Sequence, residues 1–201
     1  MLVTDPGLVK AGVVEQALAG LADCDPAFEV FDGVHPNPIE ADVEAGAAFY
    51  NEHGCDSLLA LGGGSAMDVA KVIRFFASHP APLAQYCVLD NGGAKITGAI
   101  PPFYAVPTTA GTGSEVGRGA VITLRETGRK TLFVAPPLMP TIAVLEPALT
   151  AGLPPHLTAG TGIDAFTHCL ESYFAPVYHP MADGVALEGI RLCLAHLNAA
   201  V

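Results

Sequence analysis

Short apolar runs alternate along the chain with longer stretches in which apolar residues recur every three or four positions. The short runs are typical of buried parallel strands, and the longer stretches of helices that pack one face on a core. Residues that begin or end such elements stand between them, for example Asp5-Pro6 and the proline-rich turn at residues 35–38. The alternation predicts an α/β fold with a mostly parallel sheet covered on both faces.

The pattern places each element. A first helix should open with Asp5 as its cap and Pro6 in its first turn, and two further helices should cover residues 39–53 and 65–77. Only helical patterns appear from Pro154 onward, after Gly152 and two prolines punctuate the chain. The expected strands are residues 2–4, 28–31, 57–61, 103–106, 119–124, 131–134 and 142–145.

Three consecutive glycines, Gly62, Gly63 and Gly64, follow the expected strand at residues 57–61. Ser65 comes next, and we expect it to cap the following helix. Glycines let the backbone approach a ligand closely, and the N–H groups at a helix start attract a pyrophosphate. Glycines also close ordinary strand-to-helix turns, so this motif alone leaves both interpretations open.

A second glycine-rich segment follows the strand expected at residues 103–106 and carries Thr108, Thr109, Thr112 and Ser114. Hydroxyls and backbone amides of such a segment suit phosphate and ribose oxygens. The alternative is a polar loop whose hydroxyls bond to their own backbone. Two such segments, each after a strand, indicate a cleft for a dinucleotide.

Asp164 and His168 stand four residues apart in the first helical stretch after Pro154. This spacing puts a carboxylate and an imidazole on one helical face, where they could form half of a divalent metal site. The alternative is a hydrogen-bonded pair on a helix surface.

The amino-acid composition indicates a globular protein and argues against several kinds of partner. Hydrophobic residues make up 51% of the 201 residues and charged residues 14%, so the chain has ample apolar surface for a core. The net charge of −11 argues against nucleic acid and anionic membrane as partners. No apolar run approaches the length of a membrane span and no signal peptide is seen, so we expect a cytoplasmic protein. The five cysteines contain no CxxC pair and should stay reduced: Cys24, Cys55, Cys87, Cys169 and Cys193.

Together, GGGSAMDVAK at residues 62–71, PTTAGTGSE at 107–115 and GIDAFTH at 162–168 resemble the iron-containing (group III) alcohol dehydrogenases. The segments at residues 2–5 and 34–38 resemble this family as well. The resemblance implies a parallel-sheet dinucleotide-binding domain followed by an all-helical metal-binding domain. It also implies hydride exchange between a nicotinamide cofactor and an alcohol or aldehyde, assisted by a divalent metal.

The resemblance assigns roles to individual residues. Asp5 would accept the adenosine ribose hydroxyls and favour NAD over NADP, although it could also be a plain helix cap. Asn37 matches a cofactor-contacting asparagine, and Lys130 matches a lysine that reaches the nicotinamide ribose. A turn-forming asparagine and a solvated lysine are the respective alternatives. The expected cofactor-binding set is Asp5, Asn37, Gly62, Gly63, Gly64, Ser65, Thr108, Thr109, Thr112 and Lys130. Gly62, Gly63 and Gly64 are called the glycine turn below. We expect Asp68, one turn into the next helix, to hold the glycine turn by hydrogen bonds.

Asp164 and His168 match the family's first two metal ligands, and iron(II) is the expected metal, with zinc as the alternative. The resemblance implies two further histidine ligands beyond Val201 and a first strand with its connection before Met1. His179 and His196 match no family ligand. The expected domains are residues 1–152, which bind the dinucleotide, and residues 153–201, which begin the helical metal and substrate domain.

These features predict an NAD-dependent, metal-containing alcohol dehydrogenase that acts on a small alcohol or aldehyde and forms a homo-oligomer. One alternative is a cofactor-binding fragment that is catalytically incomplete. Another is a different enzyme on the same scaffold, either a maleylacetate reductase or a lyase similar to dehydroquinate synthase. Asp164 argues against the reductase, and the segment at residues 107–115 argues against the lyase.

Overall fold

The computed structural model describes residues 1–21 and 27–201. These residues form two compact units, one of Met1–Pro107 with Ser114–Glu146 and the other of Thr108–Gly113 with Pro147–Val201. Cys24 lies outside the described residues, and the other four cysteines form no disulfide among the residues described. The domain division at residues 152 and 153 stays a prediction.

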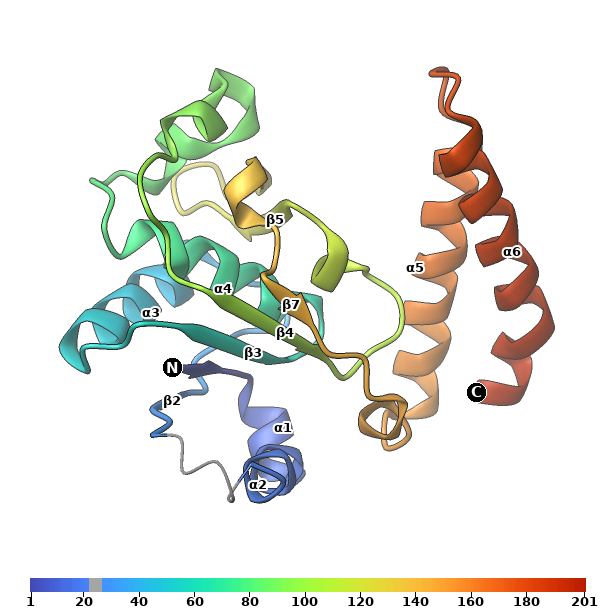
Figure 1. Ribbon diagram of the computed structural model, residues 1–201, viewed down its shortest axis with the longest axis horizontal. Helices are drawn as coiled ribbons and strands as arrows, with labels where there is room; N and C mark the ends of the chain where they lie inside the picture. The colour runs from blue at the N-terminus through green and yellow to red at the C-terminus, as the bar shows by residue number, and fades with distance from the viewer. Residues whose placement is uncertain (22–26) are drawn as a thin grey trace. The chain divides into compact units, whose positions relative to one another are not determined.

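Five parallel strands form the sheet of the first unit, in the order β2-β1-β3-β4-β7 (Figure 1). All five strands lie within one or two residues of the ranges that the apolar runs predict, so the α/β fold class is confirmed. The strands are β1 (Leu2–Val3), β2 (Val30–Phe31), β3 (Leu58–Gly62), β4 (Phe103–Pro107) and β7 (Ile142–Ala143).

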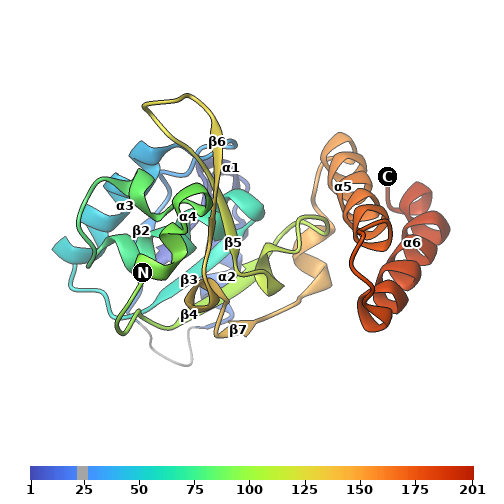
Figure 2. The same ribbon diagram turned by 90° about the horizontal axis from the view of Figure 1, so that it is seen from above.

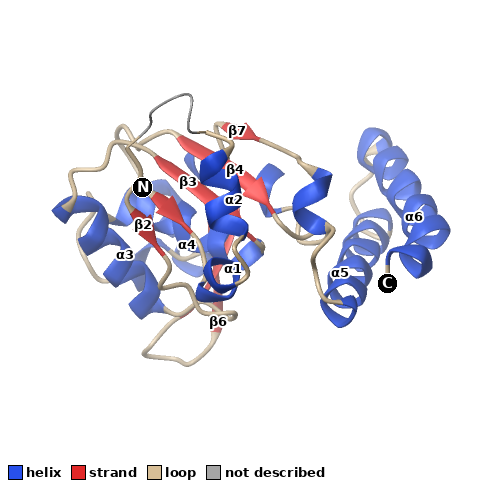
Figure 3. Cartoon of the chain, turned by 90° about the horizontal axis from the view of Figure 1, so that it is seen from below, coloured by secondary structure: helices blue, strands red, loops and turns tan. Residues whose placement is uncertain are grey.

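Two pairs of helices cover the sheet on opposite faces (Figures 1 and 3). On one face lie α1 (Pro6–Lys10) and α2 (Val13–Ala19), and on the other lie α3 (Glu40–Glu52) and α4 (Gly64–Phe76). Helices α3 and α4 match their predicted ranges to within a residue at each end. Short 3-10 helices occupy Leu83–Tyr86, Val88–Asp90, Gly92–Lys95, Ser114–Val116, Pro136–Leu138 and Pro147–Thr150.

Helix α4 lies at the centre of the first unit. It packs against β1, β3 and β4 and also against α3 and β5, so nearly every residue from Ala66 to Phe75 is buried. A helix that is apolar on all sides is stable only in such a setting. Its polar residues, Asp68, Lys71 and Arg74, recur every third position and therefore need partners inside the protein.

Arg74 is 4% exposed and bonds only to backbone carbonyls among the contacts described. Its guanidinium donates to Pro101, Pro137 and Met139 at 2.7–3.3 Å and lies over the Phe103 ring. Burial lowers the pKa of Arg74 to about 10. This side chain joins the segment before β4 to the segment between β6 and β7.

The strands β5 (Gly119–Thr123) and β6 (Lys130–Val134) form a separate antiparallel hairpin that packs on α4 (Figure 2). Asp68 fastens the hairpin, because its carboxylate accepts from Val121 N at 2.8 Å and from Ser114 Oγ at 2.7 Å. The expectation that Asp68 holds the glycine turn is therefore wrong. Asp68 lies more than a turn into α4, and its side chain is directed to the hairpin instead.

The second unit contains α5 (Pro155–Tyr173) and α6 (Pro180–Ala200), which pack on each other through glycines. A Cβ on Gly162 would lie 2.2 Å from Leu197 Cδ1, and one on Gly189 would lie 2.4 Å from Cys169 Sγ. The helical content predicted from Pro154 onward is confirmed. Within the described ranges, none of the helices combines the length and the apolar character that a membrane crossing needs.

The segment Thr108–Gly113 packs on α5 at Gly111. A Cβ on Gly111 would lie 2.4 Å from the carbonyl oxygen of Thr161, which belongs to helix backbone and cannot move aside freely. We therefore expect Gly111→Ala to lower the free energy of unfolding of the second unit by about 1–3 kcal/mol, the usual cost of overpacking.

The matched control is Gly184→Ala, on an exposed turn of α6 where nothing lies within 4 Å of the added Cβ. Alanine is the better helix former, so this variant should gain up to about 1 kcal/mol. Urea unfolding followed by circular dichroism measures both. Equal effects of the two substitutions would contradict the close approach at Gly111.

Replacing Lys71 with methionine should change how stability depends on pH. Burial lowers the pKa of Lys71 from 10.5 to about 8 in the folded chain. Between these values the unfolded chain binds more protons, so the free energy of unfolding rises with pH. The rise in the wild type should exceed that in Lys71→Met by roughly 3 kcal/mol across this window. Urea unfolding of both chains below, within and above the window measures it, and parallel curves would refute it.

Candidate functional site

The order of the strands fixes where a ligand can enter the sheet. From β1 the chain passes to β2 on one side and then crosses to β3 on the other, so the order reverses between β1 and β3. Parallel α/β sheets bind ligands outside the carboxyl ends of their strands at such a reversal of strand order. The residues that follow β1 and β3 are Asp5 and the glycine turn.

The glycine turn joins β3 to α4 through a single residue, Gly63, which is the N-cap of α4 and provides no side-chain cap. The first N–H groups of α4 are therefore free of a capping side chain, as anion binding requires. A Cβ on Gly62 would lie 2.7 Å from Ala66 Cβ, so only glycine fits at this position.

Ser65 lies inside the first turn of α4, because the helix begins at Gly64. The expectation that Ser65 caps the helix is therefore wrong. Its hydroxyl instead donates to the carbonyl oxygen of Pro36 at 2.8 Å. This bond ties the glycine turn to the loop that carries Asn37.

Asp5 caps α1: its Oδ1 accepts from Gly7 N at 2.9 Å and from Leu8 N at 3.1 Å. The alternative interpretation of Asp5 as a helix cap is thus confirmed, but it uses only one carboxylate oxygen. Oδ2 lies 3.9 Å from the position of a Cβ on Gly62. One oxygen of Asp5 is therefore directed to the glycine turn, where a ribose hydroxyl could reach it.

Asn37 is exposed at the tip of a rigid loop. The loop is held by Asp42, whose side chain is 2% exposed and accepts from His35 N, His35 Nδ1 and Ile39 N at 2.7–3.2 Å. Together with the bond from Ser65, these contacts fix Asn37 beside the glycine turn. The buried Asp42 is a supporting residue that the sequence did not single out, although its position three residues after Ile39 is typical of a helix start.

Lys130 is the exposed first residue of β6 and pairs with Thr123 of β5. Thr123 N donates in turn to the carbonyl oxygen of Pro38 at 2.8 Å. The hairpin thereby brings Lys130 to the Asn37 loop, so residues far apart in the sequence share one edge of the first unit.

Thr108 and Thr109 follow Pro107, the register partner of Gly62 on the neighbouring strand. Thr108 is 3% exposed. The Thr109 hydroxyl is buried and has no hydrogen-bond partner among the described residues, which is costly unless a ligand or water supplies one. Thr112 is half-buried in the same segment. The Thr4 hydroxyl at the end of β1 is also buried without such a partner, a feature that the sequence analysis missed.

Asp164 and His168 lie on one face of α5, with 3.6 Å between Asp164 Oδ1 and His168 Nε2. This distance is longer than a hydrogen bond, so the predicted alternative of a hydrogen-bonded pair is not observed. Both side chains are about half exposed. At 3.6 residues per turn they point away from Gly162 and Cys169, which face α6. A carboxylate and an imidazole in this arrangement suit a divalent transition metal.

Two ligands do not complete such a site. Among residues 1–21 and 27–201 no group of three His, Cys, Asp or Glu side chains could hold a metal ion. Thr161, against which Gly111 packs, precedes Asp164 by one turn on the same face of α5. The segment Thr108–Gly113, called the threonine-rich segment below, and the two candidate ligands therefore belong to one surface of the second unit.

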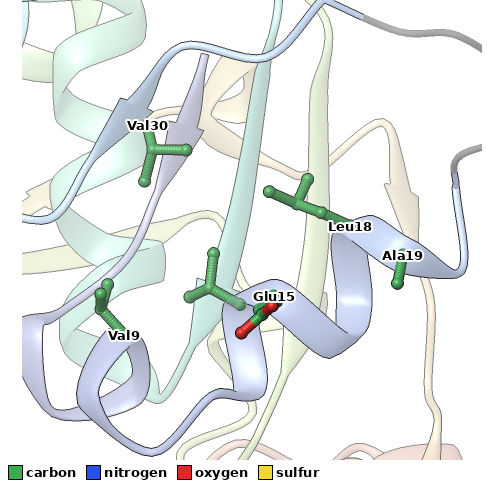
Figure 4. Close-up of a pocket in the computed structure, with 6 residues that line it drawn as sticks. Val9, Glu15, Leu18, Ala19 and Val30 are labelled. Carbon is green, nitrogen blue, oxygen red and sulfur yellow. The ribbon is translucent and has the colours of Figure 1, made fainter.

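A hollow of about 550 Å³ lies elsewhere, between α1, α2 and the edge strand β2 (Figure 4). None of its lining residues is a predicted site residue: they are Val9, Val14, Glu15, Leu18, Ala19 and Val30. Its largely apolar lining offers nothing that would recognise a pyrophosphate.

Comparison with known proteins gives a consistent result. The model for iron-containing alcohol dehydrogenase matches residues 1–147, and the model for the C-terminal part of the Fe-containing alcohol dehydrogenase family matches residues 158–201. A 4-hydroxybutyrate dehydrogenase from Cupriavidus necator is 48% identical over 200 residues, which cover 100% of this chain and 52% of the relative.

Solved structures agree. A 1,3-propanediol oxidoreductase superposes with a TM-score of 0.92 at 40% identity and covers 99% of this chain and 51% of its own. A sulfoacetaldehyde reductase from Bifidobacterium kashiwanohense, solved in complex with NAD+, has a TM-score of 0.86 at 33% identity and covers 100% and 52%. The chain spans about half the length of the curated relatives it matches. It belongs to the iron-containing alcohol dehydrogenase family.

Proposed function

We propose that the protein transfers a hydride between NAD(H) and a small alcohol or aldehyde, with a divalent metal ion held in part by Asp164 and His168. The observation that carries this function is the meeting of Asp5 Oδ2 and the uncapped glycine turn where the strand order reverses. A dinucleotide needs both features: an acceptor for ribose hydroxyls and N–H groups for its pyrophosphate.

The residues of the first unit would orient the cofactor. The N–H groups at Gly63, Gly64 and Ser65 would bind the pyrophosphate, and Asp5 the adenosine ribose. Asn37 and Lys130, fixed beside the turn by the Ser65 and Thr123 bonds, would contact the rest of the cofactor. Holding the cofactor in one orientation makes hydride transfer effectively unimolecular.

We further propose that the segment Thr108–Gly113 of the second unit contacts the cofactor. Its hydroxyls on Thr108, Thr109 and Thr112 can donate to phosphate or ribose oxygens, and the unpartnered Thr109 hydroxyl supports this role. Asp164 and His168 would hold a metal ion whose charge would polarise the substrate oxygen, and the bound nicotinamide would supply the hydride chemistry. Iron(II) is the proposed metal, although one carboxylate and one imidazole would also suit zinc.

The names of the relatives suggest which substrates to test. They include 4-hydroxybutyrate and 1,3-propanediol dehydrogenases, so short alcohols with a second polar group are the proposed substrate class. We further propose that the enzyme works in the cytoplasm as a homo-oligomer. The four described free cysteines fit a reducing compartment.

The chain should bind NADH more tightly than NADPH. One Asp5 oxygen faces the glycine turn, and its charge would repel a 2′-phosphate. Asp5→Asn keeps a capping side chain but removes the charge, so it should reduce the preference for NADH with little loss of stability. Isothermal titration calorimetry with both cofactors measures the two affinities. Equal or tighter NADPH binding by the wild type would rule out the role of Asp5.

Gly64→Val should abolish detectable NADH binding, because a branched side chain at the start of α4 would block the pyrophosphate. Gly184→Val, on an exposed turn of α6, is the control and should bind as the wild type does. Retained affinity in Gly64→Val, with the fold intact by circular dichroism, would contradict pyrophosphate binding at the glycine turn.

Residues 1–201 alone should bind metal weakly, because stable catalytic sites usually provide at least three protein ligands. We expect less than stoichiometric iron or zinc after dialysis, and little NADH formation from 1,3-propanediol or 4-hydroxybutyrate. A chimera with the C-terminal half of the Cupriavidus necator relative should gain both, and Asp164→Ala or His168→Ala should abolish them. Stoichiometric metal and turnover in the 201-residue chain would contradict the incomplete ligand set and favour a ligand from a second subunit.

A further inference from the structure

Two buried cations on α4 have no assigned role in the proposed chemistry, Lys71 and Arg74. They lie one turn apart on the same helix and are 0% and 4% exposed. Among the described residues, Arg74 bonds only to the backbone carbonyls of Pro101, Pro137 and Met139. Lys71 instead bonds to the residue that follows the threonine-rich segment, so the two cations form a natural comparison.

Lys71 uses all three of its donors. Its Nζ donates to Ser114 O at 2.6 Å, to Ser114 Oγ at 2.7 Å and to Gly119 O at 2.8 Å. Ser114 Oγ donates onward to Asp68 Oδ1 at 2.7 Å. Ser114 is thus held through both its backbone and its side chain by two residues of α4.

Ser114 is where the chain returns after the segment Thr108–Gly113. At the other end of this segment, Pro107 is fixed by the pairing of β4 with β3. Between the two ends stand Gly111 and Gly113, and Gly113 has a φ of +65°. A segment with two glycines has many accessible conformations, and anchoring both ends removes most of them.

Burying the ammonium group of Lys71 is unfavourable, which indicates that this residue does more than fill space in the core. Taking an ammonium group out of water is unfavourable, and burial depresses the pKa of Lys71 despite the opposing charges of Asp68 and Glu115. An apolar side chain of similar size commonly stabilises a core as well or better. What the ammonium adds is direction, because two of its three hydrogen bonds go to Ser114, to the backbone carbonyl and to the hydroxyl, and specify the position of that residue.

We propose that Lys71, together with Asp68, is a positioning residue that fixes the threonine-rich segment Thr108–Gly113 through Ser114 in the conformation that binds the cofactor. Lys71 touches neither cofactor nor substrate and acts only through Ser114. The part that concerns cofactor affinity rests on the proposed function. The part that concerns the conformation of the segment does not.

The test combines two measurements on the 201-residue chain. Hydrogen–deuterium exchange reports the mobility of residues 108–117 without any cofactor, and NADH titration reports affinity. The variants are Lys71→Met, Ser114→Ala and Ser114→Thr, with Arg74→Met as the control for loss of a buried cation on the same helix. Ser114→Ala removes only a hydroxyl and is the mildest change, so it remains informative if Lys71→Met folds poorly.

We expect faster exchange in residues 108–117 for Lys71→Met and Ser114→Ala but not for Arg74→Met, which should only lower overall stability. NADH affinity should fall about tenfold in the first two variants, which corresponds to about 1.4 kcal/mol. Ser114→Thr, which keeps the hydroxyl, should restore both exchange and affinity to near wild type.

The possible outcomes distinguish the positioning role of Lys71 from its effect on cofactor binding. If Lys71→Met and Arg74→Met change exchange in residues 108–117 equally, or neither Lys71→Met nor Ser114→Ala changes it, the positioning role is wrong. If exchange rises as expected but NADH affinity is unchanged, Lys71 fixes the segment and its role in cofactor binding is wrong. If the wild type itself binds no NADH, the proposed function fails, and the exchange data alone decide whether Lys71 positions the segment.

Discussion

The parallel pairing of β3 with its neighbours β1 and β4 is the constraint on which the candidate site depends. Register places Gly62 opposite Pro107, so the glycine turn and the threonine-rich segment leave adjacent strands at the same level. The reversal of strand order between β1 and β3 then leaves Asp5 beside the turn. A shift of one residue in β3 would exchange the faces of its side chains and bury the wrong set.

Hydrogen bonds, more than apolar contacts, carry this register outward into the loops. Ser65 holds the Asn37 loop, and Asp42 braces it from the other side. Asp68 and Lys71 hold Ser114 and the β5–β6 hairpin. Asp42, Asp68 and Lys71 are partly or fully buried, so losing a partner would leave an unsatisfied charge. Such loops are therefore held in defined positions although their sequences are rich in glycine and proline.

The sequence was sufficient to predict the strands, the main helices and the residues of the glycine turn, because short apolar runs and glycines report local geometry directly. The functions of Ser65 and Asp68 were predicted wrongly. Ser65 lies in the first turn and not at the cap position, because the helix begins one residue earlier than expected. The partners of Asp68 lie 46 and 53 residues away in the sequence, and no local pattern reveals such contacts.

Local sequence patterns also cannot reveal features that arise only when distant segments pack together. The close approach of Gly111 to Thr161 and the unpartnered hydroxyls of Thr4 and Thr109 depend on tertiary packing. The antiparallel pairing of β5 with β6 brings Lys130 to the Asn37 loop, and only the family resemblance had pointed to this lysine. The fold therefore adds supporting residues to a candidate site that the motifs predict.

We propose that the carboxyl edge of the parallel sheet binds a dinucleotide at the glycine turn. Titration of the ¹⁵N-labelled chain with NAD+, followed by amide chemical shifts, tests it most directly. We expect saturable shifts at Gly63, Gly64 and Ser65, with smaller shifts around Asn37 and none along the exposed turns of α6. Shifts confined to other regions, or no saturable shift at the three turn residues, would contradict the claim.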